Sequence, residues 1–222
     1  MNAAADIVFL FDVDNTLLDN DCFQDELRRE LQLAHGDRAC ARYWEIFEEL
    51  RGVLGYADYL GALERCRLED PHNPSIFRTA NWVLDYPFAD RLYPHALDVV
   101  QHVRRWGSAV ILSDGDAIFQ PHKIVRSGLW HAFDGNVLIY VHKETELADV
   151  QRWHPAGRYV LIDDKAAILA ALKAAWGDRV TTVFPKQGHY ALQAPPRDVA
   201  SVDIAIDKIG DLLGVDLSKL TR

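Results

Sequence analysis

The sequence predicts an α/β protein in which a parallel sheet is interrupted, after its first strand, by a helical bundle. Short apolar runs that alternate with helical stretches are typical of a parallel sheet covered by helices. Between residues 18 and 88 this alternation stops, and the apolar residues follow helical spacing instead. The 222 residues, of which 49% are hydrophobic and 26% charged, have the composition of a globular chain that can bury a sizeable core.

The first strand is expected at residues 7–11, where five consecutive apolar residues end at Asp12. Such a continuous run suits a strand that is buried on both faces of a parallel sheet. Similar runs, partly β-branched or aromatic, predict four further strands and a weaker sixth strand at 109–112, 137–141, 159–162, 180–184 and 202–206.

Proline and glycine residues mark the ends of the helices expected between these strands. A glycine directly follows each of three helical stretches, which are 94–106, 118–127 and 166–176. A short helix is expected around 209–213, whereas 185–196 contains three prolines and a glycine and is expected to be an irregular surface loop. The alternation of strands and helices predicts a Rossmann-like core.

Residues 18–88 contain three stripes of apolar residues at helical spacing. Because amphipathic helices usually pack their apolar faces inward, these residues are expected to form the interior of a bundle rather than a ligand site. The predicted organisation is therefore an α/β core, 1–17 and 89–222, with a helical insert, 18–88. The stripes are Tyr43, Ile46, Phe47 and Leu50, then Tyr56, Tyr59, Leu60 and Leu63, then Ile76, Ala80, Val83 and Leu84.

The charge balance and the termini exclude several classes of partner. Acidic residues outnumber basic residues by 33 to 24, which gives a net charge of −9 and argues against a broad surface for nucleic acid. The three cysteines have no metal-ligand spacing. The start, MNAAAD, lacks a basic segment, and no apolar run is long enough to span a membrane. We therefore expect a cytoplasmic protein with neither nucleic acid nor membrane as a partner.

Polar residues gather where the expected strands end, and open parallel sheets bind ligands at this edge. Pairs of carboxylates follow two of the strands, and such pairs repel each other unless a cation or a proton lies between them. A serine in a glycine-containing turn follows another strand and could bind phosphate through its hydroxyl and backbone amides. A lysine follows the run at 137–141. These candidate site residues are Asp12, Asp14, Ser113, Asp114, Lys143, Asp163 and Asp164.

Taken in this order, the segments resemble the motifs of the haloacid dehalogenase superfamily along nearly the whole chain. DVDNT at 12–16 is similar to its first motif, ILSDG at 111–115 to its second, Lys143 to its third and LIDD at 161–164 to its fourth. The helical insert resembles the family's cap of the first type. The resemblance implies the phosphatase branch of the superfamily, with magnesium as cofactor.

The resemblance also implies a role for each candidate residue. Asp12 would attack phosphorus and form an aspartyl-phosphate, and Asp14 would act as general acid and base. Ser113, Asp114 and Lys143 would bind the phosphoryl group. Mg²⁺ would be held by the carboxylate of Asp12, the backbone carbonyl of Asp14 and the pair Asp163 and Asp164, with Asp164 favoured as the direct ligand. Lys123, on the helix expected at 118–127, stays open as an alternative to Lys143.

The presence of an acid at position 14 favours a phosphatase over a dehalogenase. An alkoxide that leaves a phosphate ester benefits from protonation, whereas a departing halide needs no proton donor. We therefore expect hydrolysis of a small phosphorylated metabolite. The alternatives are a 2-haloacid dehalogenase, a phosphosugar mutase and a non-catalytic binding protein, and the sequence does not indicate an oligomeric state. The candidates for substrate contacts in the insert are Trp44, Arg51, Tyr56, His72 and Arg78.

Overall fold

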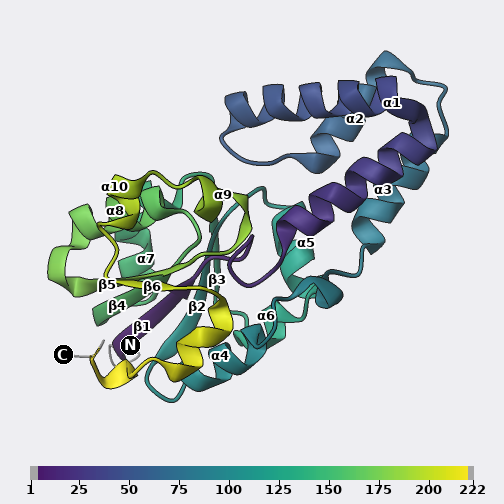
Figure 1. The fold of residues 1–222 in the computed structure, drawn as a ribbon. Coiled ribbons are helices and arrows are strands. Elements are labelled where there is room, and N and C mark those ends of the chain that lie inside the picture. Colours follow the sequence, from purple (N-terminus) through teal and green to yellow (C-terminus); the bar gives the residue numbers. More distant parts are fainter. Residues whose placement is uncertain (1–4, 220–222) are drawn as a thin grey trace.

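The computed structural model describes residues 5–219 and has a six-stranded parallel sheet at its centre (Figure 1). The order of the strands is β3-β2-β1-β4-β5-β6, and each pair of neighbours is parallel. This confirms the predicted α/β fold with a Rossmann-like parallel sheet. The strands are β1 (Ala5–Phe11), β2 (Ser108–Asp114), β3 (Val137–Tyr140), β4 (Ala156–Ile162), β5 (Val180–Pro185) and β6 (Ile204–Ile206).

Strand β1 lies in the middle of the sheet and is buried on both faces, as its apolar run predicts. Phe9 and Phe11 belong to one hydrophobic cluster, and the alternate residues Val8 and Leu10 belong to another. The first cluster is completed by α4 (Ala96–Val103), α5 (Phe119–Arg126), α6 (Leu129–Ala132) and η4 (Ile209–Gly214), and the second by α7 (Leu147–Trp153) and α8 (Ala166–Trp176). Short 3-10 helices are η1 (Phe88–Arg91), η2 (Lys143–Thr145), η3 (Gly177–Arg179) and η5 (Leu217–Lys219).

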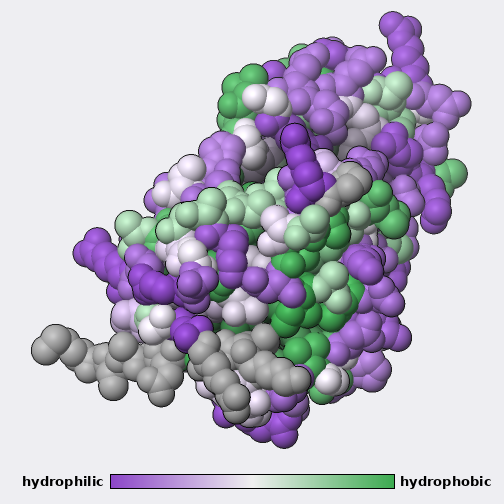
Figure 2. Space-filling model, turned by 60° about the vertical axis from the view of Figure 1, so that its left-hand side comes forward, coloured by the Kyte–Doolittle hydropathy of each residue, from purple (hydrophilic) through white to green (hydrophobic). Residues whose placement is uncertain are grey.

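Of the helices between β1 and β2, three extend away from the sheet (Figure 1). They are α1 (Asn20–Leu54), which bends at Gly36, α2 (Tyr59–Glu69) and α3 (Ser75–Asp85). The first predicted stripe is buried throughout, whereas only Tyr59 and Leu63 of the second and Ile76 and Val83 of the third are fully buried. The visible surface of this insert is mostly hydrophilic (Figure 2). Although α1 has 35 residues, no helix in the described part of the chain combines the length and apolar character needed to cross a membrane.

The chain leaves the core and returns to it along two adjacent backbone segments. Leu18 and Leu92 form an antiparallel bridge. The backbone N–H of Asp19 donates to the carbonyl of Arg91 at 2.8 Å, and that of Tyr93 donates to the carbonyl of Leu17 at 2.9 Å. The two segments that join the insert to the core are thus hydrogen-bonded to each other at an isolated β-bridge.

The predicted irregular loop at 185–196 is wrong in part, because it contains the helix α9 (Gly188–Gln193). Its prolines lie outside the helix, and Gly188 adopts a positive φ of 68° at its start, so neither residue type interrupts it. A second short helix, α10 (Pro196–Val199), begins three residues after α9 ends. The helix expected at 94–106 is shorter than predicted and covers only Ala96–Val103.

Candidate active site

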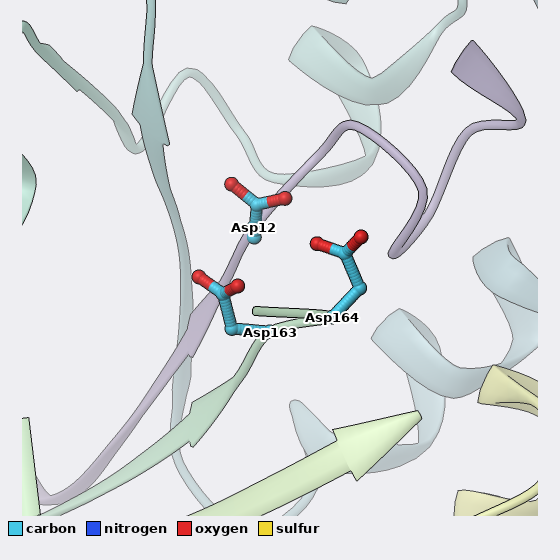
Figure 3. Close-up of side chains that lie close together, drawn as sticks. All are labelled: Asp12, Asp163 and Asp164. Atoms are coloured by element: carbon cyan, nitrogen blue, oxygen red, sulfur yellow. The ribbon is translucent and has the colours of Figure 1, made fainter. Parts of the chain in front are cut away.

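Neighbouring strands bring the predicted carboxylates together at one edge of the sheet. Strand β1 pairs with β4, so Asp12 at the end of one strand lies beside Asp163 and Asp164 at the end of the other. Their carboxylates face the same small space (Figure 3), and a ligand atom from each lies within 4.8 Å of the others. Asp12 is 3% exposed, and the other two are fully buried. Three acids at such close range need positive charge nearby.

The loop after β1 is fixed by its own side chains. Asn15 adopts the left-handed conformation with a φ of 59°, which asparagine tolerates better than most residues. Its Oδ1 accepts hydrogen bonds of 3.1 Å from the backbone N–H groups of Asn20 and Asp21, where the insert begins. Thr16 Oγ1 accepts a hydrogen bond of 3.1 Å from the backbone N–H of Asp164. These contacts connect the loop after β1 both to the start of the insert and to the acid pair Asp163 and Asp164 after β4.

Lys143 supplies the positive charge closest to the carboxylates. Its fully buried Nζ lies 2.6 Å from Asp12 Oδ1 and 2.6 Å from Asp163 Oδ2, and it donates to the carbonyl of Leu112 at 3.3 Å. Burial alone would lower the pKa of Lys143, but the charges of Asp12 and Asp163 outweigh it and raise the pKa above its ordinary value. Lys143 is therefore a cation held between two of the acids.

The alternative lysine, Lys123, contacts a different acid. Its Nζ is buried, lies 2.5 Å from Asp14 Oδ1, and donates to Asn20 Oδ1 at 3.4 Å. The other carboxylate oxygen of Asp14 accepts a hydrogen bond of 3.2 Å from Gln120. Each of the first two predicted acids thus has a lysine of its own, and the two lysines are not competitors for one position.

The serine and the aspartate after β2 have separate partners. Ser113 Oγ accepts a hydrogen bond of 2.9 Å from Gln120 Nε2, which also contacts Asp14. Asp114 Oδ1 accepts a hydrogen bond of 2.8 Å from the backbone N–H of Lys143 and so fixes the start of η2. Burial raises the pKa of Asp114 above its ordinary value. Sequence reasoning missed Gln120, because a glutamine carries no chemistry that marks it until its contacts are known.

The carboxylate cluster has the donor set of a site for a hard divalent cation. Among the described residues, no hydrogen-bond donor reaches Asp12 Oδ2 or either carboxylate oxygen of Asp164. Burial and the neighbouring acids Asp163 and Asp12 raise the pKa of Asp164 well above its ordinary value, and burial raises that of Asp163 to about 6. Oxygen ligands with unsatisfied lone pairs suit Mg²⁺. The residues present therefore fit this ion.

A cavity of about 120 Å³ lies between the insert and the core next to these acids. Asp14 and Asp114 line its core side. Of the five substrate-contact candidates in the insert, Arg51 and Tyr56 line it. The other three do not: Trp44 packs within the insert, and His72 and Arg78 are exposed. Sequence reasoning missed three further lining residues, Lys165, His189 and Tyr190, the last two because α9 was expected to be a loop.

The model of the haloacid dehalogenase-like hydrolases matches residues 8–183, which include all the carboxylates described above. The chain belongs to this family. A protein of Burkholderia xenovorans LB400, described as a haloacid dehalogenase-like hydrolase, has 53% sequence identity and a TM-score of 0.88, with 96% of this chain and 97% of that chain covered. None of the curated proteins searched matches the chain.

More distant haloacid dehalogenase-like structures share the fold. A family hydrolase from Xanthomonas campestris has a TM-score of 0.70 at 15% identity, with 100% of this chain and 94% of that chain covered. The L-2-haloacid dehalogenase of Xanthobacter autotrophicus has a TM-score of 0.61 at 16% identity, with 96% and 98% covered. At 15% and 16% identity, these likenesses show the fold alone.

Proposed function

We propose that the protein is a cytoplasmic, Mg²⁺-dependent phosphatase that hydrolyses small phosphorylated metabolites through an aspartyl-phosphate intermediate. The observation that carries this proposal is the position of Asp14, which lines the cavity and has its carboxylate held by Lys123. An acid in this position can protonate an alkoxide that leaves a phosphate ester. Cleavage of a carbon–halogen bond could use the same Asp12 but would leave Asp14 without a task.

In the first step, a carboxylate oxygen of Asp12 attacks phosphorus and the bond between phosphorus and the ester oxygen breaks. Asp14 gives its proton to the leaving oxygen, so that the alcohol departs neutral. In the second step, Asp14 takes a proton from water, whose oxygen attacks phosphorus and releases inorganic phosphate and free Asp12. Lys143, which contacts Asp12 at 2.6 Å, offsets the negative charge that accumulates around the phosphoryl group, and Ser113 and Asp114 belong to the phosphate-binding turn.

The metal site in this proposal consists of the carboxylate of Asp12, the backbone carbonyl of Asp14 and the acids Asp163 and Asp164. Asp164 is favoured as the direct ligand, because no donor in residues 5–219 reaches either of its oxygens. Asp163, in contrast, accepts from the backbone N–H of Lys165 at 2.7 Å and pairs with Lys143. When bound, Mg²⁺ supplies positive charge that polarises the phosphoryl oxygens. We propose that residues 18–88 act as a cap over this site and that residues 1–17 and 89–222 form the catalytic core.

The proposal is tested by measuring hydrolysis of 4-nitrophenyl phosphate and of a panel of metabolite phosphates, with Mg²⁺ and with a chelator. We expect turnover that requires the metal and that is abolished in Asp12→Asn. With the metabolite phosphates, whose leaving groups need a proton, Asp14→Asn is expected to retain less than about 1% of the activity, the range in which general acid–base catalysis contributes. Release of chloride from 2-chloropropionate, without hydrolysis of any ester, would establish the dehalogenase instead.

A further inference from the structure

Two cations from distant parts of the chain meet around one aromatic ring at the cavity. Arg51, near the end of α1, donates a hydrogen bond to the hydroxyl of Tyr190 on α9, and its guanidinium carbon lies 5.8 Å from the centroid of that ring. The Nζ of Lys165, which follows the acid pair after β4, lies 5.0 Å from the same centroid. Tyr190 thus connects a cation of the insert with a cation of the core.

All three side chains line the cavity whose core side contains Asp14. Three nearby acids, Asp12, Asp163 and Asp164, attract the charge of Lys165, and the attraction by Asp12 is the largest. Among the described residues, none of the three accepts a hydrogen bond from its ammonium group. Within the part of the chain that the structure describes, Arg51 has one carboxylate partner, the exposed Glu48, at 3.6 Å. The cavity therefore has, at one end, the carboxylate of Asp14 already paired with Lys123, and at the other end two cations beside Tyr190.

A partly buried ammonium without a close counter-ion gains free energy when an anion binds beside it. The guanidinium of arginine adds a planar pair of donors that matches the two oxygens of a carboxylate or phosphate. The cavity of about 120 Å³ restricts such a ligand to a small molecule. The reacting phosphoryl group itself belongs at the carboxylates, so an anion between Arg51 and Lys165 would be a second group.

We infer that Arg51 and Lys165 form a subsite, organised by Tyr190, for a second anionic group of the substrate, so that the preferred substrates are small phosphate monoesters that carry a carboxylate or a second phosphate. This inference rests on the proposed function, because it assigns the substrate class of the same site. The inference also assigns a role to α9, because Tyr190 on this helix contacts both Arg51 of the insert and Lys165 of the core.

The test compares esters that differ only in the second group. The ω-carboxyalkyl phosphates, beginning with 2-phosphoglycolate, are measured beside alkyl phosphates of equal length, beginning with ethyl phosphate, and ethylene glycol bisphosphate distinguishes phosphate from carboxylate. The wild type is expected to prefer the best anionic ester by about 10- to 100-fold in kcat/KM, the effect of one charge-assisted hydrogen bond. In Arg51→Gln and Lys165→Met, activity towards the anionic ester is expected to fall about tenfold more than activity towards its neutral partner.

A matched control is Arg29→Gln, which removes the same charge from an exposed position of the same helix and is expected to change neither rate. Equal hydrolysis of anionic and neutral esters by the wild type would overturn the inference and leave the phosphatase in place. Equal losses on both esters in the variants would also overturn it, because they would assign the cations to the reacting phosphoryl group.

Binding measurements separate the subsite from turnover. Calorimetry with phosphonoacetate and ethylphosphonate, neither of which can be hydrolysed, is expected to give the same preference for the anionic compound and the same loss in Arg51→Gln and Lys165→Met. If no ester is hydrolysed but this preference is present, the proposed function fails and the subsite is supported. If the preference is absent as well, both fail.

Discussion

The ammonium group of Lys123 lies 2.5 Å from Oδ1 of Asp14, and that of Lys143 lies 2.6 Å from Oδ1 of Asp12. Helix α5 therefore reaches the site through a buried charge, although Lys123 and Asp14 are 109 residues apart in the sequence. The two lysines therefore have different roles: Lys123 positions the carboxylate of Asp14, and Lys143 offsets the negative charge of Asp12.

Replacing Lys123 by methionine is expected to affect alkyl phosphates more than aryl phosphates. The variant removes the cation that positions Asp14, and an alkoxide depends more on a proton donor than a phenoxide does. We expect kcat/KM to fall by about 100-fold with an alkyl phosphate and by less with 4-nitrophenyl phosphate, whose leaving group needs little protonation. Equal losses with both esters would show that Lys123 acts on folding or binding and not through Asp14.

Replacing Lys143 by methionine is expected to lower the free energy of unfolding of the metal-free protein by about 3–5 kcal/mol, because Asp12 and Asp163 are left buried without their cation. The measurement is urea unfolding in the presence of a chelator. Lys186→Met, which removes an exposed lysine paired with Asp207 at 3.4 Å, is the control and is expected to change stability by less than about 1 kcal/mol. A similar effect in both variants would contradict the buried pairing.

Asp164→Asn is expected to stabilise the metal-free protein at pH 7.5 and to abolish its response to Mg²⁺. The pKa of Asp164 is raised in the folded state, so the stability that this group contributes is present at low pH and is lost as the pH rises. The uncharged amide removes this cost and with it a metal ligand. Mg²⁺ at 100 times its Kd should raise the free energy of unfolding of the wild type by about 2.7 kcal/mol, which is measured as a higher temperature of thermal unfolding. An unchanged shift in the variant would remove Asp164 from the metal site.

His35 is expected to make the insert sensitive to acid. Burial and then the charge of Arg78 lower its pKa below the ordinary value of 6.5, and its Nε2 lies 2.9 Å from Thr79 Oγ1. A folded-state pKa below the unfolded value means that the contribution to stability is present above pH 6.5 and is lost as the pH falls through the folded pKa.

The measurement for His35 is urea unfolding at pH 7.5 and at pH 5. His35→Gln is expected to lose less stability between these two pH values than the wild type does. The exposed residue His131 provides the control, because His131→Gln should behave like the wild type. A steeper loss in His35→Gln would contradict the sign of the shift.

The sequence was sufficient for the parts of the site that depend on strand order. Buried parallel strands leave continuous apolar runs, and the residues that follow them meet at one edge, so Asp12, Asp163 and Asp164 could be brought together without coordinates. The structure adds what spacing cannot express, namely that Lys123 and Lys143 contact different acids. A long side chain can reach several neighbours, and its position along the chain does not select one of them.

Helix α9 could not be predicted because its stability does not come from its own sequence. Its six residues are too few for an isolated helix in water, and the prolines after it indicate a loop. Its position depends on tertiary contacts: His189 Nδ1 lies 2.5 Å from Asp21 Oδ1, and Tyr190 meets Arg51. Short helices of this kind become visible only with the partners that hold them.

The bridge between Leu18 and Leu92 makes the two ends of the insert neighbours in space. An insert of some seventy residues therefore leaves the core and re-enters it at neighbouring positions, as a short loop would. The conformational entropy lost in bringing its two ends together is the entropy of closing a loop. The free-energy cost of closing a loop grows only with the logarithm of its length. The helices between these two leucines could therefore be lengthened, shortened or exchanged with little effect on the register of β1 and β2. The carboxylates at the strand ends would keep their positions while the selectivity above them changed.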